Sequence, residues 1–438
     1  MDASKKTMDL SPLDQIMPRV YSRLILAFPC SAGKISDSSL HLRAGLDRLI
    51  SEVEYFAGEV VPSDTGRGAL EIRLRTPSIH LVWSEKDLRA TDSGWTHSYE
   101  GLRAAGMPLS KLEEGFLAPV SAFPMPGEPA PVMKVQCNSI VGGLLLCVCV
   151  HHSVMDGPSL ATVLQRWADI TRNETDSGHT ANSSDALLEG SLGRSPLIKG
   201  LPSAKEHAEY EIPSLQLAPP PSTEASAAPA LPPMAAATFV LSAKFLTELK
   251  GEVSSLLETQ ESWVSTNDAV SALMWRSITA ARSSKSSSAG QDAQSAYGMA
   301  PEEINLGHSR TLAKLAMSIR NAVTSIDDAH IRSVIHLVNS LPDVSVVLPA
   351  FSPFLTQNMA ITSWASLPVY DFNWGDSVGD TGKADFVRIP KAAFDGLCII
   401  LPQTSSCEFE VIVGLKSDHM ENLKRYEYFK RFAELRSV

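Results

Sequence analysis

A pair of histidines follows directly after an apolar run in the first half of the chain. The run Leu144–Val150 has no polar alternation, so it predicts a strand buried on both faces. His151 and His152 come immediately after it, and Pro158 begins a helical pattern beyond a tight turn. Unperturbed imidazole titrates near ~6.5, so a histidine held there can accept a proton at cellular pH. The order strand, histidine, turn, helix predicts a general base beside a cavity.

Two other interpretations of this segment remain open. A single histidine near a core is more often structural than catalytic. Cys147, Cys149 and His151 also share one face of the predicted strand, because side chains alternate along a strand, and together they offer metal ligands. We expect no metal site, since structural zinc sites usually pair cysteines as C-x2-C with a second cluster, and the chain has no such pattern.

A second motif lies about half a chain further on. The segment His152–Gly157 resembles the H-x-x-x-D-G signature of the BAHD acyl-CoA-dependent acyltransferases, and Asp371–Gly375 resembles their D-F-G-W-G motif. Both occur in the family's order and spacing, and the chain is similar to fungal members of the trichothecene 3-O-acetyltransferase type. Further stretches that carry this resemblance are Leu10–Gln15, Ser265–Ala269, Trp275–Ser277, Thr362–Trp364 and Phe394–Gly396.

The resemblance implies transfer of an acyl group, acetyl being the expected one, from coenzyme A to a hydroxyl or amine. His152 matches the family's base, which deprotonates the acceptor in a ternary complex; a positioned base typically contributes ~10²–10⁴-fold. Thr362 and Trp364 match residues that donate to the oxyanion, where losing one donor typically costs ~2.7–4 kcal/mol. Acyl-CoA is then a co-substrate, and no permanently bound cofactor is expected.

Five further motif residues are expected to be structural. The resemblance implies that Asp156 points away from the substrate and pairs with an arginine. Gly157 is expected to supply a backbone conformation, or a close approach, that a Cβ would block. Asp371 and Trp374 are expected to shape the channel rather than to take part in the chemistry, and Gly375 is expected to be a structural residue of the same motif.

The sequence departs from the family pattern in two places. Asn373 replaces the first glycine of the second motif, and asparagine tolerates the left-handed conformation better than most residues. The family usually carries, after residue 282, a strand whose arginine pairs with the residue matching Asp371. Residues 283–309 are instead a polar, low-complexity run that predicts a disordered loop, so Arg310 or Arg320 becomes the candidate partner.

Charge limits the partners of the chain. The net charge is −11, from 38 basic and 49 acidic side chains, and there is no long basic run. This argues against nucleic acid or an anionic membrane as a partner and favours a small-molecule acceptor with acyl-CoA. Coenzyme A is polyanionic, so we expect a local site for it: Ser265 and Thr266 by resemblance, with Lys383 or Arg388 as basic candidates.

Length and composition predict two soluble globular domains. The chain has 438 residues, with 44% hydrophobic and 20% charged side chains, which is ordinary for such proteins. The N-terminus lacks an apolar signal segment, and the longest apolar run is far short of the ~20 residues of a membrane helix. Six cysteines without framework spacing suit a reducing interior. We therefore expect a cytoplasmic monomer.

Strand and helix patterns alternate in both halves, which predicts an α/β fold. The resemblance implies two chloramphenicol-acetyltransferase-like domains with mixed sheets, residues 1–200 and 236–438, joined by a long crossover linker at 201–235. Acyl-CoA and acceptor would enter a shared channel from opposite ends, with His152 midway. Strands are predicted at 21–28, 69–74, 79–82, 132–140, 144–151, 237–241, 397–401 and 409–415. Helices are predicted at 40–56, 159–170, 244–257, 312–323, 328–341 and 420–435, and a further helix is predicted to begin at 265 or 266. His330 and His336, in the helix predicted at 328–341, are expected to be structural.

Three functions remain in competition. The leading hypothesis is O-acyl transfer in specialised metabolism. The second is a non-acyl cyclisation or condensation on the same fold, or binding alone, which the unusual residues 283–309 and Asn373 motivate. The third is condensation or epimerisation within a peptide synthetase, where a doubled histidine such as His151-His152 occurs; the motif Asp371–Gly375 and the lack of a carrier domain disfavour it. The acceptor and the acyl length are not readable from sequence.

Overall fold

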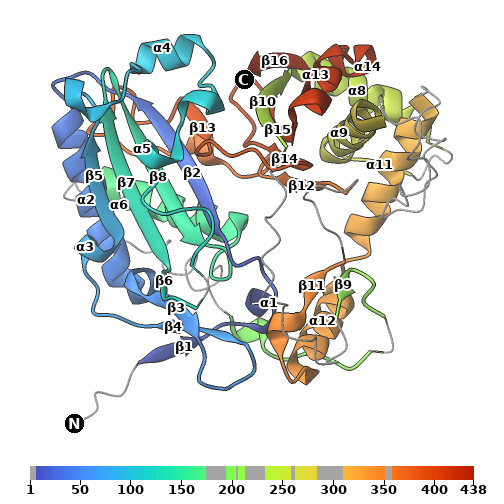
Figure 1. Cartoon of the computed structure of the whole chain (residues 1–438), viewed down its shortest axis with the longest axis horizontal. Helices are drawn as coiled ribbons and strands as arrows, with labels where there is room; N and C mark the ends of the chain where they lie inside the picture. Colours follow the sequence, from blue (N-terminus) through green and yellow to red (C-terminus); the bar gives the residue numbers. More distant parts are fainter. Residues whose placement is uncertain are drawn as a thin grey trace, which may run out of the picture.

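Each half of the chain is built around a five-stranded mixed sheet (Figure 1). The computed structural model describes residues 6–125, 127–173, 194–203, 206–212, 232–257, 262–283, 309–350 and 358–438. The strand order is β13-β2-β8-β7-β5 in the first sheet and β12-β14-β15-β10-β16 in the second. Each sheet combines antiparallel pairs with one parallel pair, β5–β7 and β12–β14. The predicted α/β fold with two mixed sheets is confirmed.

The first sheet is centred on the predicted buried strand. Its strands are β2 (Tyr21–Pro29), β5 (Trp83–Asp87), β7 (Met133–Ile140), β8 (Gly143–His151) and β13 (Phe386–Arg388). All nine residues of β8 are buried between β2 and β7, as the apolar run predicted. Gly142 adopts φ +80° at the β7–β8 turn, a conformation that glycine reaches without strain.

Helices cover one face of this sheet (Figure 1). They are α2 (Ile35–Glu52), α3 (Ile79–Val82) and α6 (Gly157–Asn173). The Trp167 indole of α6 donates to the Leu42 carbonyl of α2 at 2.9 Å. The strand predicted at 79–82 is wrong, because the two buried residues are Ile79 and Val82, whose i, i+3 spacing is helical.

The second sheet has its own helical layer. Its strands are β10 (Met234–Leu241), β12 (Ala360–Ser363), β14 (Leu397–Ile400), β15 (Phe409–Lys416) and β16 (Glu434–Ser437). The helices are α8 (Ala243–Ser254), α9 (Thr266–Ser283), α11 (Ser309–Thr324), α13 (Ser417–Arg425) and α14 (Glu427–Lys430). The helix predicted at 420–435 is wrong at its end, because Tyr426 is extended and residues 434–437 pair with β10 as an edge strand.

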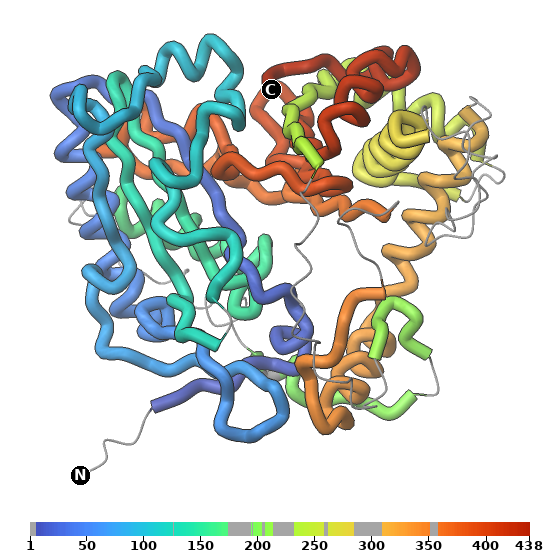
Figure 2. The backbone as a smooth tube through the Cα atoms, in the orientation of Figure 1, coloured from blue at the N-terminus to red at the C-terminus, as the bar shows by residue number. Residues whose placement is uncertain are grey.

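Smaller elements lie below the two sheets in the views of Figures 1 and 2. A four-stranded sheet contains β1 (Thr7–Asp9), β4 (Leu70–Arg73), β3 (Glu59–Pro62) and β6 (Ala130–Pro131). A two-stranded ribbon pairs β9 (Tyr210–Glu211) with β11 (Leu348–Pro349), next to helix α12 (Asp328–Ser340). The short helices α4 (Tyr99–Ala104) and α5 (Glu114–Leu117) lie higher, α4 at the top of Figure 1, whereas α1 (Pro12–Gln15) lies in this lower part. Ile16, Val334, Val338, Val344 and Val347 form a small satellite core there.

Several stretches of the chain fall outside the described residues. These are 174–193, most of the crossover linker at 201–235, and 284–308 in the atypical segment. The domain limits 1–200 and 236–438 stay a prediction. Among the described helices, none has the length and apolar character needed to cross a membrane.

The late strand β13 lies in the first sheet, although its residues belong to the second half of the sequence. It pairs antiparallel with β2, and Phe372, Trp374 and Val387 are buried in the core of the first half. Arg388 of β13 reaches Glu410 of β15 in the second sheet, with paired N–O distances of 2.7 and 2.9 Å. A buried, bidentate ion pair therefore joins the two sheets.

Backbone carbonyls complete the surroundings of this guanidinium. Arg388 donates to the carbonyls of Gly106 at 3.0 Å and Met107 at 3.1 Å, and it is 0% exposed. Burying a charge is unfavourable unless it is paired and hydrogen-bonded, and here both conditions hold.

Arg388→Met is expected to destabilise the protein by about 3–5 kcal/mol, because Glu410 would remain buried without its partner. Urea denaturation measures this change in the free energy of unfolding. The double variant Arg388→Met, Glu410→Leu should regain most of the loss. The control Arg332→Met, which breaks the exposed pair with Asp328, should change little. Wild-type stability in Arg388→Met would refute the bridging role.

His151 ends strand β8 inside the first core. Its ring contacts the Tyr21 ring edge-on at 5.5 Å between centroids, and its Nδ1 accepts from the Ser153 amide at 3.3 Å. Burial lowers the pKa of His151 to about 4, and the neighbouring His152 and Arg19 add to this effect. His151 is therefore neutral at cellular pH.

The lowered pKa of His151 links stability to acid pH. Between pH ~6.5 and ~4 the unfolded chain binds a proton at this ring that the folded chain does not bind, so stability is present above that window and falls by up to roughly 3 kcal/mol on acidification. His151→Asn retains an acceptor for Ser153 without a titrating ring. Its unfolding free energy, measured from pH 7 to 4, should therefore fall less steeply than that of the wild type. Equal slopes would contradict the assignment.

Candidate active site

His152 is the first residue after strand β8. Its amide donates to the Val20 carbonyl at 2.8 Å, which fixes the backbone beside strand β2. Because successive side chains of an extended chain point to opposite sides, burying His151 in the core directs His152 the other way. The half-buried His152 side chain lines a large cavity. Its Nδ1 has no hydrogen-bond partner in the described part of the chain, so no carboxylate orients this imidazole.

The cavity has a volume of about 1110 Å³ and takes its walls from both halves of the chain. Most of the wall is apolar: Val20, Leu24, Leu160 and Leu164 from the first half, and Leu367, Ile389, Phe394, Leu397 and Ile399 from the second. An apolar cavity of this size with a few polar groups is typical of a small-molecule site.

Thr362 and Trp364 line the same cavity. Thr362 lies on β12, and the Trp364 amide beyond that strand donates to the Ile400 carbonyl at 2.8 Å. The Trp364 indole nitrogen would lie 3.9 Å from a Cβ built on Gly157, so the second half reaches the histidine loop. The structure thus brings together the three residues for which a chemical role was predicted.

Asp156 and Gly157 differ from expectation. The Asp156 carboxylate accepts from the Ser159 amide at 2.9 Å at the start of α6, and within the described ranges no arginine pairs with it. Gly157 has no positive φ, and an added Cβ would meet side chains of the opposite wall at ordinary distances of 3.6–3.9 Å. Neither reason given for this glycine is supported, whereas Asp156 stabilises the loop by capping the helix.

An arginine does hold the histidine loop, but through a carbonyl. Arg194 donates to the Val154 carbonyl at 2.9 Å and to the Asp14 carboxylate at 2.8 Å. Asp14 also accepts from the Ser11 amide at 2.9 Å, in a capping box that begins α1. No local pattern marks Arg194 in the sequence; the only available signal was the family-like stretch that contains Asp14.

The second motif packs into the first core rather than lining the cavity. Trp374 is 0% exposed and contacts Trp167 and Phe28 edge-on, at centroid distances of 5.1 and 5.9 Å. Gly375 has φ +87°, and a Cβ there would lie 3.1 Å from the backbone of Arg172, so glycine is required. Trp374 and Gly375 therefore belong to the core of the first half, and the expectation that Trp374 shapes the channel is corrected.

Asn373 and Asp371 also behave differently from the prediction. Asn373 has no positive φ; its side-chain oxygen accepts from the Gly375 amide at 3.0 Å, which closes the turn. Asp371 is exposed and has no ion pair with any described residue. Arg320, one candidate partner, pairs instead with Asp268 of helix α9.

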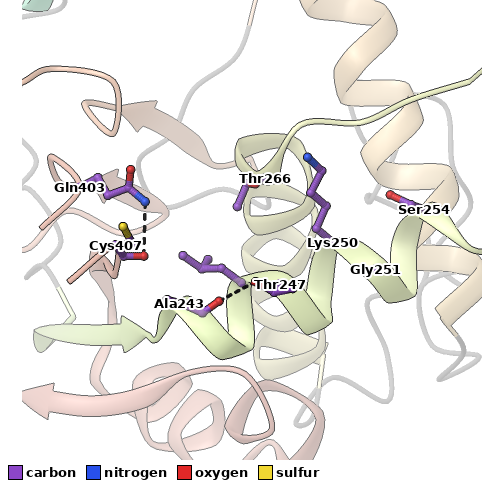
Figure 3. Close-up of a pocket in the computed structure, with 9 residues that line it drawn as sticks. Ala243, Thr247, Lys250, Gly251, Ser254, Thr266, Gln403 and Cys407 are labelled. Carbon is purple, nitrogen blue, oxygen red and sulfur yellow. Dashed lines mark hydrogen bonds between the residues drawn. The ribbon is translucent and has the colours of Figure 1, made fainter. Parts of the chain in front are cut away.

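A smaller cavity of about 530 Å³ lies beside helix α8 and the start of α9 (Figure 3). Thr266 lines it, together with Lys250, Ser254 and Gln403. Ser265 caps α9: it accepts from the Asp268 amide at 3.1 Å, and the Asp268 carboxylate accepts from the Ser265 amide at 2.6 Å. Lys250 was not predicted from the sequence, although the α8 residues of this wall, at 243, 246, 247, 250, 251 and 254, follow helical spacing.

The basic residues named from the sequence lie elsewhere. Lys383 lines neither cavity; its amide donates to the Thr381 hydroxyl at 3.3 Å, in the loop after the second motif. Arg388 is fully buried in its ion pair with Glu410. Neither is placed to meet a ligand at Thr266.

The thiols beside His151 are engaged with each other. The Cys147 and Cys149 sulfurs are 3.7 Å apart, and this contact together with burial holds the pKa of Cys147 well above its ordinary value. A metal needs thiolate, which this environment disfavours.

Comparison with known proteins assigns the chain to a family. A sequence model of the trichothecene 3-O-acetyltransferase-like N-terminal domain matches residues 20–168, and a model of the Transferase family matches residues 110–302. The chain is 28% identical to the eremophilane O-acetyltransferase of Penicillium rubens over 97% of both chains. It is 27% identical to the trichothecene 3-O-acetyltransferase of Fusarium sporotrichioides over 95% of this chain and 94% of that one.

Solved structures share the fold. The F. sporotrichioides enzyme in complex with coenzyme A and T-2 superposes with a TM-score of 0.77, at 22% identity over 99% of this chain and 100% of that one. Vinorine synthase superposes with a TM-score of 0.60, at 15% identity over 99% of this chain and 95% of that one. The chain belongs to the Transferase (BAHD) family of acyltransferases, with its trichothecene 3-O-acetyltransferase-like fungal members.

Proposed function

We propose that the protein transfers an acetyl group from acetyl-CoA to a hydroxyl of an apolar specialised metabolite, with His152 as the general base. The observation that carries this proposal is the half-buried imidazole on the wall of the large cavity, which it shares with Thr362 and Trp364. The relatives named for O-acetyl transfer support the reaction type.

The proposed reaction needs one base and one oxyanion site. His152 removes the proton of the acceptor hydroxyl, whose oxygen attacks the thioester carbonyl in the ternary complex. The carbon–sulfur bond then breaks, and the imidazolium returns the proton to the leaving thiolate, so the products are an ester and free coenzyme A. A base that transfers one proton twice needs no second titrating group at the site.

Thr362 and Trp364 are proposed to stabilise the tetrahedral oxyanion. The Thr362 hydroxyl and the Trp364 indole N–H are both donors, and both line the wall that faces the histidine loop. The apolar wall excludes water, which strengthens such bonds at the moment when charge develops. Both reactants held side by side in one cavity also react as if at high concentration.

The acceptor is proposed to be a compact alcohol of mostly apolar surface. The wall side chains of the large cavity are chiefly leucine, isoleucine, valine, proline and phenylalanine. Eremophilane and trichothecene acceptors, which the names of relatives mention, are of this kind.

The protein is also proposed to be a monomer located in the cytoplasm. All six cysteines are free thiols, which suits a reducing interior.

Coenzyme A is proposed to bind across the two cavities. Pro402 lines the large cavity and Gln403 the small one, so one strand-end segment connects them. The Lys250 ammonium, beside Thr266 in Figure 3, supplies the positive charge that phosphate groups need. The pantetheine arm would then reach Thr362 in the large cavity.

His152→Ala should lower kcat by ~10²–10⁴-fold, because the acceptor would lose its base. Release of free thiol from acetyl-CoA, measured with a panel of apolar polycyclic alcohols, tests both the activity and the base. His151→Asn is the matched control: the neighbouring ring is neutral and faces the core, so most of the activity should remain. Full activity in His152→Ala would reject the base, and acetyl-CoA binding without thiol release for any acceptor would favour the non-acyl alternative.

Lys250→Ala should raise KM for acetyl-CoA about tenfold with little change in kcat, because one phosphate contact is worth roughly 1–3 kcal/mol. Steady-state kinetics at two salt concentrations measure the change. The KM of the wild type should rise more steeply with salt than the KM of Lys250→Ala, because salt screens the contact that the variant lacks. Lys244→Ala, an exposed lysine on the same helix, and Lys383→Ala should leave KM unchanged. A KM that responds only to Lys383→Ala would place the coenzyme elsewhere.

A further inference from the structure

A cluster of two imidazoles and a carboxylate lies outside both cavities. Ligand atoms of His207, Glu209 and His330 all lie within 4.8 Å of one another. His207 Nδ1 is 3.0 Å and His330 Nε2 is 2.9 Å from the same oxygen, Glu209 Oε1. His207 and Glu209 precede strand β9, whereas His330 lies in the first turn of helix α12. The cluster therefore joins the end of the described crossover segment to α12.

We propose that His207, Glu209 and His330 together bind one zinc ion. Imidazole and carboxylate are ligands that zinc prefers, and three protein ligands with one open position make a common zinc site. Zinc–ligand bonds of ~2.0–2.2 Å in a tetrahedron place neighbouring ligand atoms roughly 3.3 Å apart, so the present separations need only small side-chain movements.

The surroundings of the cluster fit an ion of this kind. His207 Nε2 lies 2.8 Å from the Ser333 hydroxyl, a bond that fixes the ring and leaves Nδ1 toward Glu209. His330 already directs its Nε2 toward Glu209, and its Nδ1 has no hydrogen-bond partner among the described residues, so binding a metal through Nε2 would break no other bond of this ring. Both imidazoles are 8% exposed, whereas Glu209 is 39% exposed, which leaves one side of the site open to a water ligand.

Zinc here would fasten one wall of the large cavity. The Ala350 amide donates to the Glu209 carbonyl at 2.9 Å, and Glu211, Leu348, Pro349 and Ala350 line that cavity. Among the described residues, the adjoining satellite core consists of five buried apolar side chains with a few partly buried ones packed against it, so it is a small core. A metal staple is a usual means of stabilising so small a core.

The experiment is a titration of chelator-treated full-length protein with zinc chloride, followed by calorimetry. One ion per chain is expected, with a higher melting temperature on binding. His330→Ala should abolish binding, and Ser333→Ala should weaken it by about 10–100-fold, since it removes only the bond behind His207. His336→Ala, an exposed histidine on the same helix, should bind zinc as the wild type does.

Glu209→Gln keeps the size of the side chain and an acceptor for one imidazole, so it tests the site if His330→Ala does not fold. It should lose at least tenfold in zinc affinity, together with the rise in melting temperature. No zinc binding by the wild type, or binding that all these variants retain, would overturn the proposal and leave three hydrogen-bonded side chains with no metal.

Discussion

The ion pair of Arg388 with Glu410 determines how the two sheets meet. Arg388 belongs to a strand of the first sheet and Glu410 to a strand of the second, and both charges are buried. A charge in such a place is tolerated only with full pairing, so few relative positions of the sheets satisfy it. The large cavity lies between the same two halves, and its shape therefore depends on this contact.

The site combines one rigid part from each half. β8 is a central strand with every residue buried, so the imidazole at its end is held by the core of the first half. β12 and the segment after it carry Thr362 and Trp364 from the second half. Arg194 and Asp14 hold the loop between the histidine and helix α6 through the Val154 carbonyl. In the proposed reaction, preorganisation of this kind would let the two substrates meet in a site whose side chains are already in place.

The sequence predicted elements best where local pattern and tertiary burial agree. The apolar run before His151 became the buried strand β8, and Gly142 lies in the turn that precedes it. The pattern failed at Ile79–Val82, where apolar residues that suit a strand form one helical turn, and at 434–437, where pairing with β10 overrode helical spacing. Short segments take their structure from the neighbours they contact, which a local pattern does not record.

Long-range partners were the other gap. His152, Thr362 and Trp364 were found through motifs, and they share one cavity. Arg194 lies 40 residues from the Val154 carbonyl that it holds, and Glu410 lies 22 residues from Arg388, so local spacing could not reveal either contact. Arg320 was a candidate partner of Asp371 from the sequence, but in the structure it pairs with Asp268, a residue that caps helix α9.

The position of β13 beside β2 has a consequence for synthesis on the ribosome. β2 is made within the first 29 residues, yet the strand that covers its outer edge ends at residue 388 of 438. At ~5–20 residues per second, an apolar edge with unpaired amides waits for tens of seconds in the nascent chain. The first sheet can therefore be completed only after most of the chain has been synthesised.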